Sequence, residues 1–258
     1  PAALLDPAHD ERIGRSFLLE GDGETVSSGT LVILLGVGGA WLALQEGLPW
    51  ATGGRGNARW FHDTLVGYLE TIALTAGSTE IAKALVGRLR PDYQNRIERA
   101  HCAGDDLDAT LCPDGALEPL GPTAADVDYA MLDGRRSFWS GHSAHSFNFA
   151  TYISLAIGGR FVWGADASPT SAALGILGQT ALLSTATFIA ASRVEDGRHH
   201  PSDVLTGAMV GMGLAQLSYW RRFGADGKPR QRPEPGTATV DLGAGPGVAG
   251  LALTVRYR

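Results

Sequence analysis

The stretch SRVEDGRHHPSDV, residues 192–204, connects the last two apolar segments of the chain and carries two adjacent histidines. Pro201 follows them directly and predicts the start of a helix, because the first helical turn tolerates a residue without an N–H. Arg193 lies at the end of the preceding apolar segment. We therefore expect a helix, a short loop and a second helix, with His200 capping the second helix rather than taking part in chemistry.

The spacing of His199 and Asp203 separates the first histidine from the second. They lie four positions apart, so the carboxylate is expected to reach back to one imidazole nitrogen. Such a bond would fix the tautomer and leave the other nitrogen free as a nucleophile. The simpler interpretation is that Asp203 stabilises the positive end of the helix dipole. The spacing nevertheless favours His199 as a nucleophile.

The rest of the chain predicts an all-α protein. Among its 258 residues, 44% are hydrophobic, which is enough for a sizeable core, and the net charge of -6 argues against nucleic-acid binding. Its five apolar stretches are each too long for ordinary strands. They cover roughly residues 29–45, 61–88, 144–163, 168–191 and 203–220. We expect a bundle of helices, and the mean hydropathy near zero is low for several membrane-spanning segments.

A polar insert, residues 92–136, interrupts the helical pattern. It contains ten acidic residues and is too long for a simple connection, which indicates a functional loop or a cap. Both cysteines of the chain, Cys102 and Cys112, lie within it. We expect them to form a disulfide, which would imply an oxidising compartment; two unrelated thiols in a reducing compartment are the alternative.

The C-terminal part differs in composition from the helical body. We assign residues 1–220 to one helical domain that includes the insert, and residues 221–258 to a basic, Pro/Gly-rich linker followed by an alternating apolar–polar tail. The GAGPG sequence at 243–247 interrupts that alternation. The tail is therefore predicted to be a small β-hairpin.

Two further blocks concentrate groups that bind anions. In KALVGRLRP, residues 83–91, Lys83 and Arg90 are two helical turns apart, so both project from one face near a helix end. In SFWSGHSAHSF, residues 137–147, Ser140 is a predicted N-cap, and Gly141 allows an anion to approach the free N–H groups. His142 would lie beside that anion, where an imidazole can transfer a proton.

Each of these residues also has an interpretation without catalysis. The two cations of the first block could be a surface pair whose charged ends reach solvent. His145 forms an HxxH spacing with His142, but no carboxylate or cysteine accompanies it in that block, so packing is the better interpretation. These interpretations explain each block alone but not the three blocks together.

Together, Lys83-x6-Arg90-Pro91, Ser140-Gly141-His142 and Ser192-Arg193-x5-His199-x3-Asp203 resemble the three-part signature of the type 2 phosphatidic acid phosphatase family. That superfamily includes bacterial class A acid phosphatases and vanadium-dependent haloperoxidases. The resemblance covers about residues 61–220 and implies a helical bundle of this type. One departure is Trp139, which replaces the proline that commonly precedes the Ser-Gly-His element; we expect it to affect substrate shape.

The resemblance implies a metal-independent phosphatase acting on phosphomonoesters or lipid phosphates through a phosphohistidine. His199 would attack phosphorus, Asp203 would orient it, and His142 would protonate the leaving group. The remaining signature residues would bind the phosphate oxygens: Lys83, Arg90, Ser140, Gly141 and Arg193. No cofactor is required, and phosphate or vanadate would occupy the same site, since vanadate mimics the transition state.

The same residues are compatible with several alternatives. A vanadate-dependent haloperoxidase would have the same signature residues. A phosphate-binding protein without activity would lack one of them, and none is missing. A zinc hydrolase would use His142, His145, His199 and Asp203.

The expected partner is a phosphorylated small molecule or a lipid phosphate. We expect an exported, periplasmic protein, soluble or apposed to a membrane; the alternative is an integral inner-membrane protein with a periplasmic site. The sequence is compatible with membrane-surface association and with a homo-oligomer.

Overall fold

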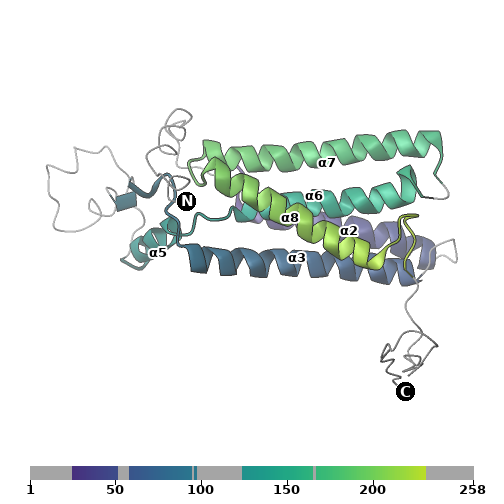
Figure 1. Ribbon diagram of the computed structural model, residues 1–258, viewed down its shortest axis with the longest axis horizontal. Helices are drawn as coiled ribbons and strands as arrows, with labels where there is room; N and C mark the ends of the chain where they lie inside the picture. The colour runs from purple at the N-terminus through teal and green to yellow at the C-terminus, as the bar shows by residue number, and fades with distance from the viewer. Residues whose placement is uncertain (1–24, 52–57, 95, 98–123, 165–166, 231–258) are drawn as a thin grey trace, which may run out of the picture.

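The computed structural model describes residues 25–51, 58–94, 96–97, 124–164 and 167–230, and it is a helical bundle (Figure 1). Five long helices form the bundle, a shorter helix lies beside it, and a π-helical turn, η2 (Gly158–Val162), follows one of the long helices. Their bounds are α2 (Ser28–Ala51), α3 (Ala58–Val86), α5 (Ala124–Gly134), α6 (Gly141–Ile157), α7 (Pro169–Glu195) and α8 (Pro201–Arg222). In this part of the chain, the only β-type pairing is an isolated bridge between Phe223 and Pro229.

The five apolar stretches predicted as helices correspond to α2, α3, α6, α7 and α8, so the all-α prediction is confirmed. Helix α8 continues through Arg222, two residues into the predicted linker. The predicted hairpin tail and the Cys102–Cys112 disulfide lie outside the described residues. Both stay predictions.

Successive long helices run in opposite directions, and α6 contacts each of the other four (Figure 1). Helices α3 and α7 end where α6 and α8 begin. We call this the site end, and we call the other end, where α8 finishes, the opposite end. The predicted signature residues all lie at or near the site end.

Aromatic side chains fill the core toward the opposite end. Tyr68, Tyr152 and Tyr219 are almost completely buried. The ring of Tyr219 stacks on Phe223 at 4.7 Å between centroids and meets Tyr152 edge-on at 6.0 Å. The ring of Tyr68 lies 5.8 Å from that of Tyr152, so these contacts join α3, α6 and α8 and stabilise the bundle by burying large apolar surfaces.

Glycines bring α8 unusually close to α6. A Cβ on Gly207 would lie 2.5 Å from the carbonyl oxygen of Ser140, and one on Gly211 would lie 2.0 Å from that of Ala144. Only glycine permits this approach, and its repetition at a spacing of four keeps one helix face against α6. As a result, the first turn of α8 lies against the first turn of α6.

Large apolar side chains remain exposed on the outside of the bundle. On the long helices, those more than half exposed occur on α2, α3, α7 and α8 and include Val32, Ile33, Leu69, Ile81, Leu174, Leu177, Leu205 and Met209. Two helices are long and apolar enough to cross a membrane, α2 over Ser28–Gln45 and α7 over Pro169–Glu195. Only 17% of each is buried in the bundle, so neither is a core helix of the usual soluble kind.

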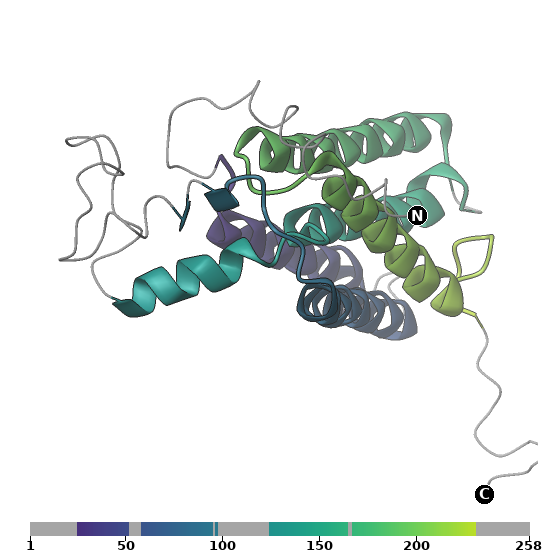
Figure 2. The same cartoon turned by 60° about the vertical axis from the view of Figure 1, so that its left-hand side comes forward.

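Helix α5 is the element that the sequence did not predict. It ends the polar insert and projects away from the bundle at the site end (Figure 2). Its last turn is fixed to the segment after α3, because the Arg90 N–H donates to the carbonyl of Gly134 at 2.8 Å. The end of the insert is therefore part of the site end.

Candidate active site

Three segments far apart in sequence meet at the site end. They are the end of α3 with the residues after it, the segment that leads into α6, and the loop between α7 and α8. The Ser140 N–H donates to the carbonyl of Asp203 at 3.1 Å, and the Ser137 N–H donates to that of Arg88 at 3.0 Å. These backbone bonds join the three signature blocks directly.

The start of α6 has the predicted form of an anion site. Ser140 is the N-cap, and its hydroxyl accepts a hydrogen bond from the Ser143 N–H. A Cβ on Gly141 would lie 3.5 Å from Nζ of Lys83, so the ammonium lies beside the first helical residue. A cation and free helix N–H groups therefore face the same small region.

His199 is buried, and its Nδ1 lies 2.7 Å from the backbone carbonyl oxygen of Ser137. A carbonyl oxygen can only accept, so Nδ1 carries the proton and donates it. The lone pair of the neutral ring is then on Nε2. This is the tautomer that a nucleophilic histidine needs.

The electrostatic surroundings keep His199 neutral. Burial lowers the pKa of its imidazole well below the ordinary value, and the charges of Arg90, Arg193 and Lys83 lower it further. The hydrogen bond to Ser137 opposes this shift. The three predicted phosphate-binding cations thus converge on one neutral imidazole.

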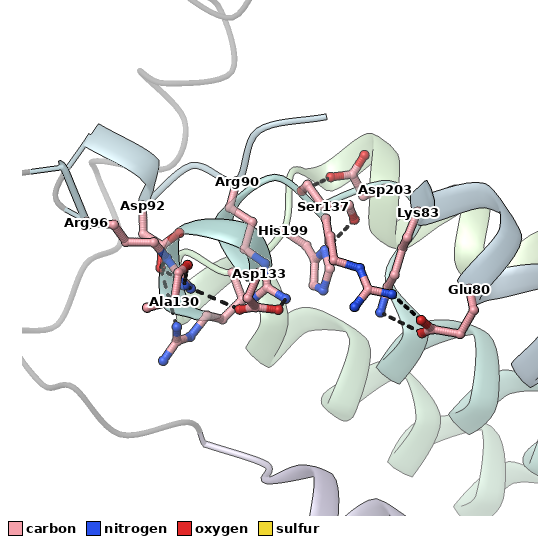
Figure 3. A network of polar contacts seen from close by, with 12 residues as sticks. Glu80, Lys83, Arg90, Asp92, Arg96, Ala130, Asp133, Ser137, His199 and Asp203 are labelled. Atoms are coloured by element: carbon pink, nitrogen blue, oxygen red, sulfur yellow. Dashed lines mark hydrogen bonds and ion pairs between the residues drawn. The ribbon is translucent and has the colours of Figure 1, made fainter. Parts of the chain in front are cut away.

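Each of these cations is held by a carboxylate. Lys83 lies 3.6 Å from Glu80, and Arg193 lies 3.4 Å from Asp196. Arg90 donates to Asp133 of α5 at 2.7 Å (Figure 3). Asp133 also pairs with Arg96 at 3.3 Å, so α5 braces Arg90 from outside the bundle.

The predicted bond from Asp203 to the ring of His199 is wrong. The carboxylate of Asp203 accepts hydrogen bonds from the Ser137 hydroxyl, from Arg88 Nη1 at 2.8 Å and from the His200 N–H at 3.2 Å. Ser137 therefore lies between the carboxylate and the imidazole (Figure 3). The first turn of α8 directs the Asp203 side chain back across the helix start, toward the segment that leads into α6.

His142 and His200 lie at the helix starts where the sequence predicts them. His142 is half-buried in the first turn of α6, directly after Gly141. His200 is the N-cap residue of α8, and its Nε2 lies 3.0 Å from the carbonyl oxygen of Leu89. The described residues contain no group of three or more His, Cys, Asp or Glu side chains that could hold a metal ion, so the four-residue zinc site does not form.

Sequence reasoning missed three residues of this site: Ser137, Arg88 and Asp133. Ser137 and Arg88 both lie inside the two quoted blocks, so their proximity to the signature was visible. Asp133 had no such signal, because it is 43 positions from Arg90, near the far end of the insert. Only the fold brings it to the site.

Comparison with known families identifies the superfamily of the chain. The PAP2 superfamily matches residues 64–225, and the chain belongs to this superfamily. The match begins in the first half of α3 and ends just after α8. It therefore contains all three signature blocks.

Individual relatives are lipid phosphatases by name. "Phospholipid phosphatase 2" of Mus musculus is 28% identical over 204 residues, covering 79% of this chain and 68% of the relative. "Phospholipid phosphatase 1" of Rattus norvegicus is 32% identical over 141 residues, covering 54% of this chain and 45% of the relative. "Probable diacylglycerol pyrophosphate phosphatase 1" of Schizosaccharomyces pombe is 27% identical over 169 residues, covering 66% and 57%. The chain spans about half the length of several such curated relatives. No solved structure matches it.

Proposed function

We propose that the protein is a phosphatase that hydrolyses phosphomonoesters or lipid phosphates through a phosphohistidine, without a metal ion. The observation that carries the proposal is the environment of His199. Its Nδ1–H is held by a carbonyl, and the charges of three cations lower the pKa of the ring and favour its neutral form. Such an arrangement suits phosphoryl transfer, which depends mainly on positioning and on stabilising negative charge.

In the first step, the Nε2 lone pair of His199 attacks phosphorus while the ester P–O bond breaks. Lys83, Arg90 and Arg193 stabilise the equatorial oxygens, with the Ser140 hydroxyl and the Gly141 N–H at the start of α6. His142 gives a proton to the departing alkoxide. The products are a free alcohol and a phosphohistidine.

In the second step, a water molecule attacks the phosphohistidine. His142, now neutral, takes a proton from that water, and the P–N bond breaks. Inorganic phosphate leaves, and His199 recovers its lone pair. Vanadate is expected to inhibit, because its trigonal-bipyramidal adduct with Nε2 resembles both transition states.

The names of the relatives support lipid phosphates as the substrate class. The surface supports the integral alternative over a merely apposed protein, since exposed apolar side chains surround the bundle on four helices. Cations gather at the opposite end: Arg59, Arg160, Arg221, Arg222, Lys228 and Arg230. The described part of the site end carries at least as many Lys and Arg residues, so their number alone does not orient the protein. We propose that the basic segment after α8 is a cytoplasmic flank and that the site faces the periplasm.

The test is phosphate release by the protein in detergent with a chelator present. The panel is phosphatidic acid, isoprenoid pyrophosphates, nucleotides and aryl phosphates. We expect release from at least one ester, inhibition by vanadate, and an acid-labile phosphoenzyme when the reaction is quenched. Peroxide-dependent halide oxidation with added vanadate, and no release from any ester, would instead establish a haloperoxidase.

Membrane insertion is tested separately by extraction. We expect the protein to stay in the membrane fraction after washing with high salt and alkaline carbonate, and to leave it only in detergent. Release by the washes alone would show a peripheral protein.

A further inference from the structure

Asp203 is completely buried, yet the hydrogen bonds of its carboxylate go to groups other than the imidazole. Arg88 is its charged partner, and the Ser137 hydroxyl and the His200 N–H complete its hydrogen bonding. A buried carboxylate with one ion pair and two further donors is held firmly in one position. Any influence of Asp203 on the orientation of His199 must pass through a neighbour.

Ser137 has the contacts that such a neighbour needs. Its carbonyl accepts the Nδ1–H of His199, its hydroxyl donates to Asp203, and its N–H donates to the Arg88 carbonyl. The residue has no solvent exposure. Arg88 therefore fixes it twice, once through the backbone and once through Asp203. The carbonyl that holds the imidazole is thereby anchored on both sides.

We propose that Ser137 is a positioning residue for the nucleophile, and that Asp203 and Arg88 act on His199 through it. The proposal rests on the phosphatase function given above and deepens it. Loosening Ser137 lets its carbonyl and the imidazole move together. Displacement of a reacting group by about 1 Å can cost on the order of 100-fold in rate.

The first experiment compares Ser137→Ala with Ser146→Ala. Both residues are buried, but the Ser146 hydroxyl donates only to the Ser143 carbonyl in its own helix, at 3.2 Å. We expect Ser137→Ala to lower kcat about 10- to 100-fold with KM changed less than about threefold, because phosphate binding is untouched. Ser146→Ala should behave as wild type. Equal losses in the two variants would overturn the proposal.

A second variant covers the case in which Ser137→Ala does not fold. Arg88→Gln leaves Ser137 itself unchanged but removes the charge that holds Asp203. We expect it to lower kcat with little change in KM, as Ser137→Ala would. A wild-type kcat in Arg88→Gln would contradict the proposal that Arg88 acts on His199 through Ser137.

The sharpest test is a double-mutant cycle with Asp203→Asn. If Asp203 acts through Ser137, its substitution lowers kcat about 10- to 100-fold in wild type and only a fewfold in Ser137→Ala. Independent action would give the same loss in both backgrounds. Additive losses would therefore overturn the proposal even if each single variant is slow.

A readout without turnover separates this proposal from the phosphatase function. In protein with ¹⁵N-labelled histidine, we expect the His199 signals to show a protonated Nδ1 and an unprotonated Nε2, with His199→Gln providing the assignment. Ser137→Ala should mix the tautomers, and Ser146→Ala should not. If the wild-type protein released no phosphate from any ester, the proposed phosphatase function would be wrong, but these spectra would still test the role of Ser137. Unchanged His199 signals in Ser137→Ala would refute the proposal that Ser137 positions His199.

Discussion

Both ends of the bundle contain ion pairs between a basic side chain and a carboxylate, but these pairs have different roles at the two ends. Toward the opposite end, Glu70 of α3 accepts hydrogen bonds from Arg221 and Arg222 at the end of α8. At the site end, Lys83, Arg90 and Arg193 each have a carboxylate partner as well. The difference is that, at the site end, the charges of the three cations also act on His199 and lower the pKa of its imidazole.

This comparison shows how an ion pair can serve stability or function. At the opposite end, the carboxylate joins two helices, and the interaction is complete within the protein. At the site end, the carboxylates hold like charges near one another and near a neutral base, which is unfavourable until an anion binds. Variants at the site end should therefore change turnover, and variants at the opposite end should change stability.

The largest effect is expected for His199→Ala. Without the nucleophile, phosphohistidine cannot form, and turnover should fall about 10⁴-fold or more. The helical circular dichroism should persist, because His199 lies in the loop between α7 and α8 and not within a helix. The exposed His62 at the start of α3 is the matched control, and His62→Ala should retain turnover. Normal rates in His199→Ala would eliminate it as the nucleophile.

Gly207→Ala should break the site end without touching a charged group. Its Cβ would meet the Ser140 carbonyl at 2.5 Å and push the start of α8 from α6. We expect kcat/KM to fall on the order of 100-fold through misplacement of His199. Gly213 is the control on the same helix, since a Cβ there meets nothing within 4 Å. Equal rates in Gly207→Ala and Gly213→Ala would show that the close approach is dispensable.

Asp133→Asn should test whether α5 belongs to the site. Arg90 would lose its charged partner and its fixed direction, so KM should rise about tenfold with a smaller change in kcat. Asp128→Asn, on the exposed side of the same helix, is the control. An unchanged KM would mean that Arg90 is held well enough by the backbone.

The lowered pKa of His199 predicts how activity depends on pH. The neutral, nucleophilic form of His199 persists below the ordinary imidazole pKa of about 6.5. In a plot of kcat/KM against pH, the midpoint of the acidic limb should therefore lie below pH 6.5. Measuring two substrates whose phosphates have different pKa values separates protonation of the enzyme from protonation of the substrate, because only the latter moves with the substrate. An enzyme limb at or above pH 6.5 would contradict the electrostatic description of the site.

The same shift predicts the direction of the stability change. Below about pH 6.5, the unfolded chain binds a proton at His199 that the folded protein does not, so the free energy of unfolding falls as the pH falls. His199→Ala should flatten this dependence between pH 6.5 and 5. Denaturation at several pH values measures it, and an identical slope in wild type and variant would contradict it.

Much of the fold follows from the sequence because segment length and apolar content are local properties. The five predicted segments match five helices. Helix α5 was missed because its 11 residues lie in an acidic insert without a long apolar stretch. Its position depends on contacts with Arg90 and Arg96, which no local pattern encodes.

The site was predictable as a group of residues but not in its connections. Fixed spacing within three blocks identified the cations, the N-cap and His199. The spacing of four between His199 and Asp203 suggested a direct bond, but Ser137 lies between them. Ser137 is 62 positions from His199 and 66 from Asp203, so this arrangement depends on how α6 and α8 pack.

The smallest effect on turnover is expected for Glu70→Gln, which tests the opposite end. Glutamine keeps one acceptor but removes the charge that joins α3 to Arg222, so stability should fall by about 1 kcal/mol. For a chain of this size, this corresponds to a melting temperature lower by roughly 2–4 °C. Turnover should stay at the wild-type rate, because the catalytic cations are held by other carboxylates. A large loss of turnover at unchanged stability would mean that charge at the opposite end also influences the site, and the functional separation of the two ends would fail.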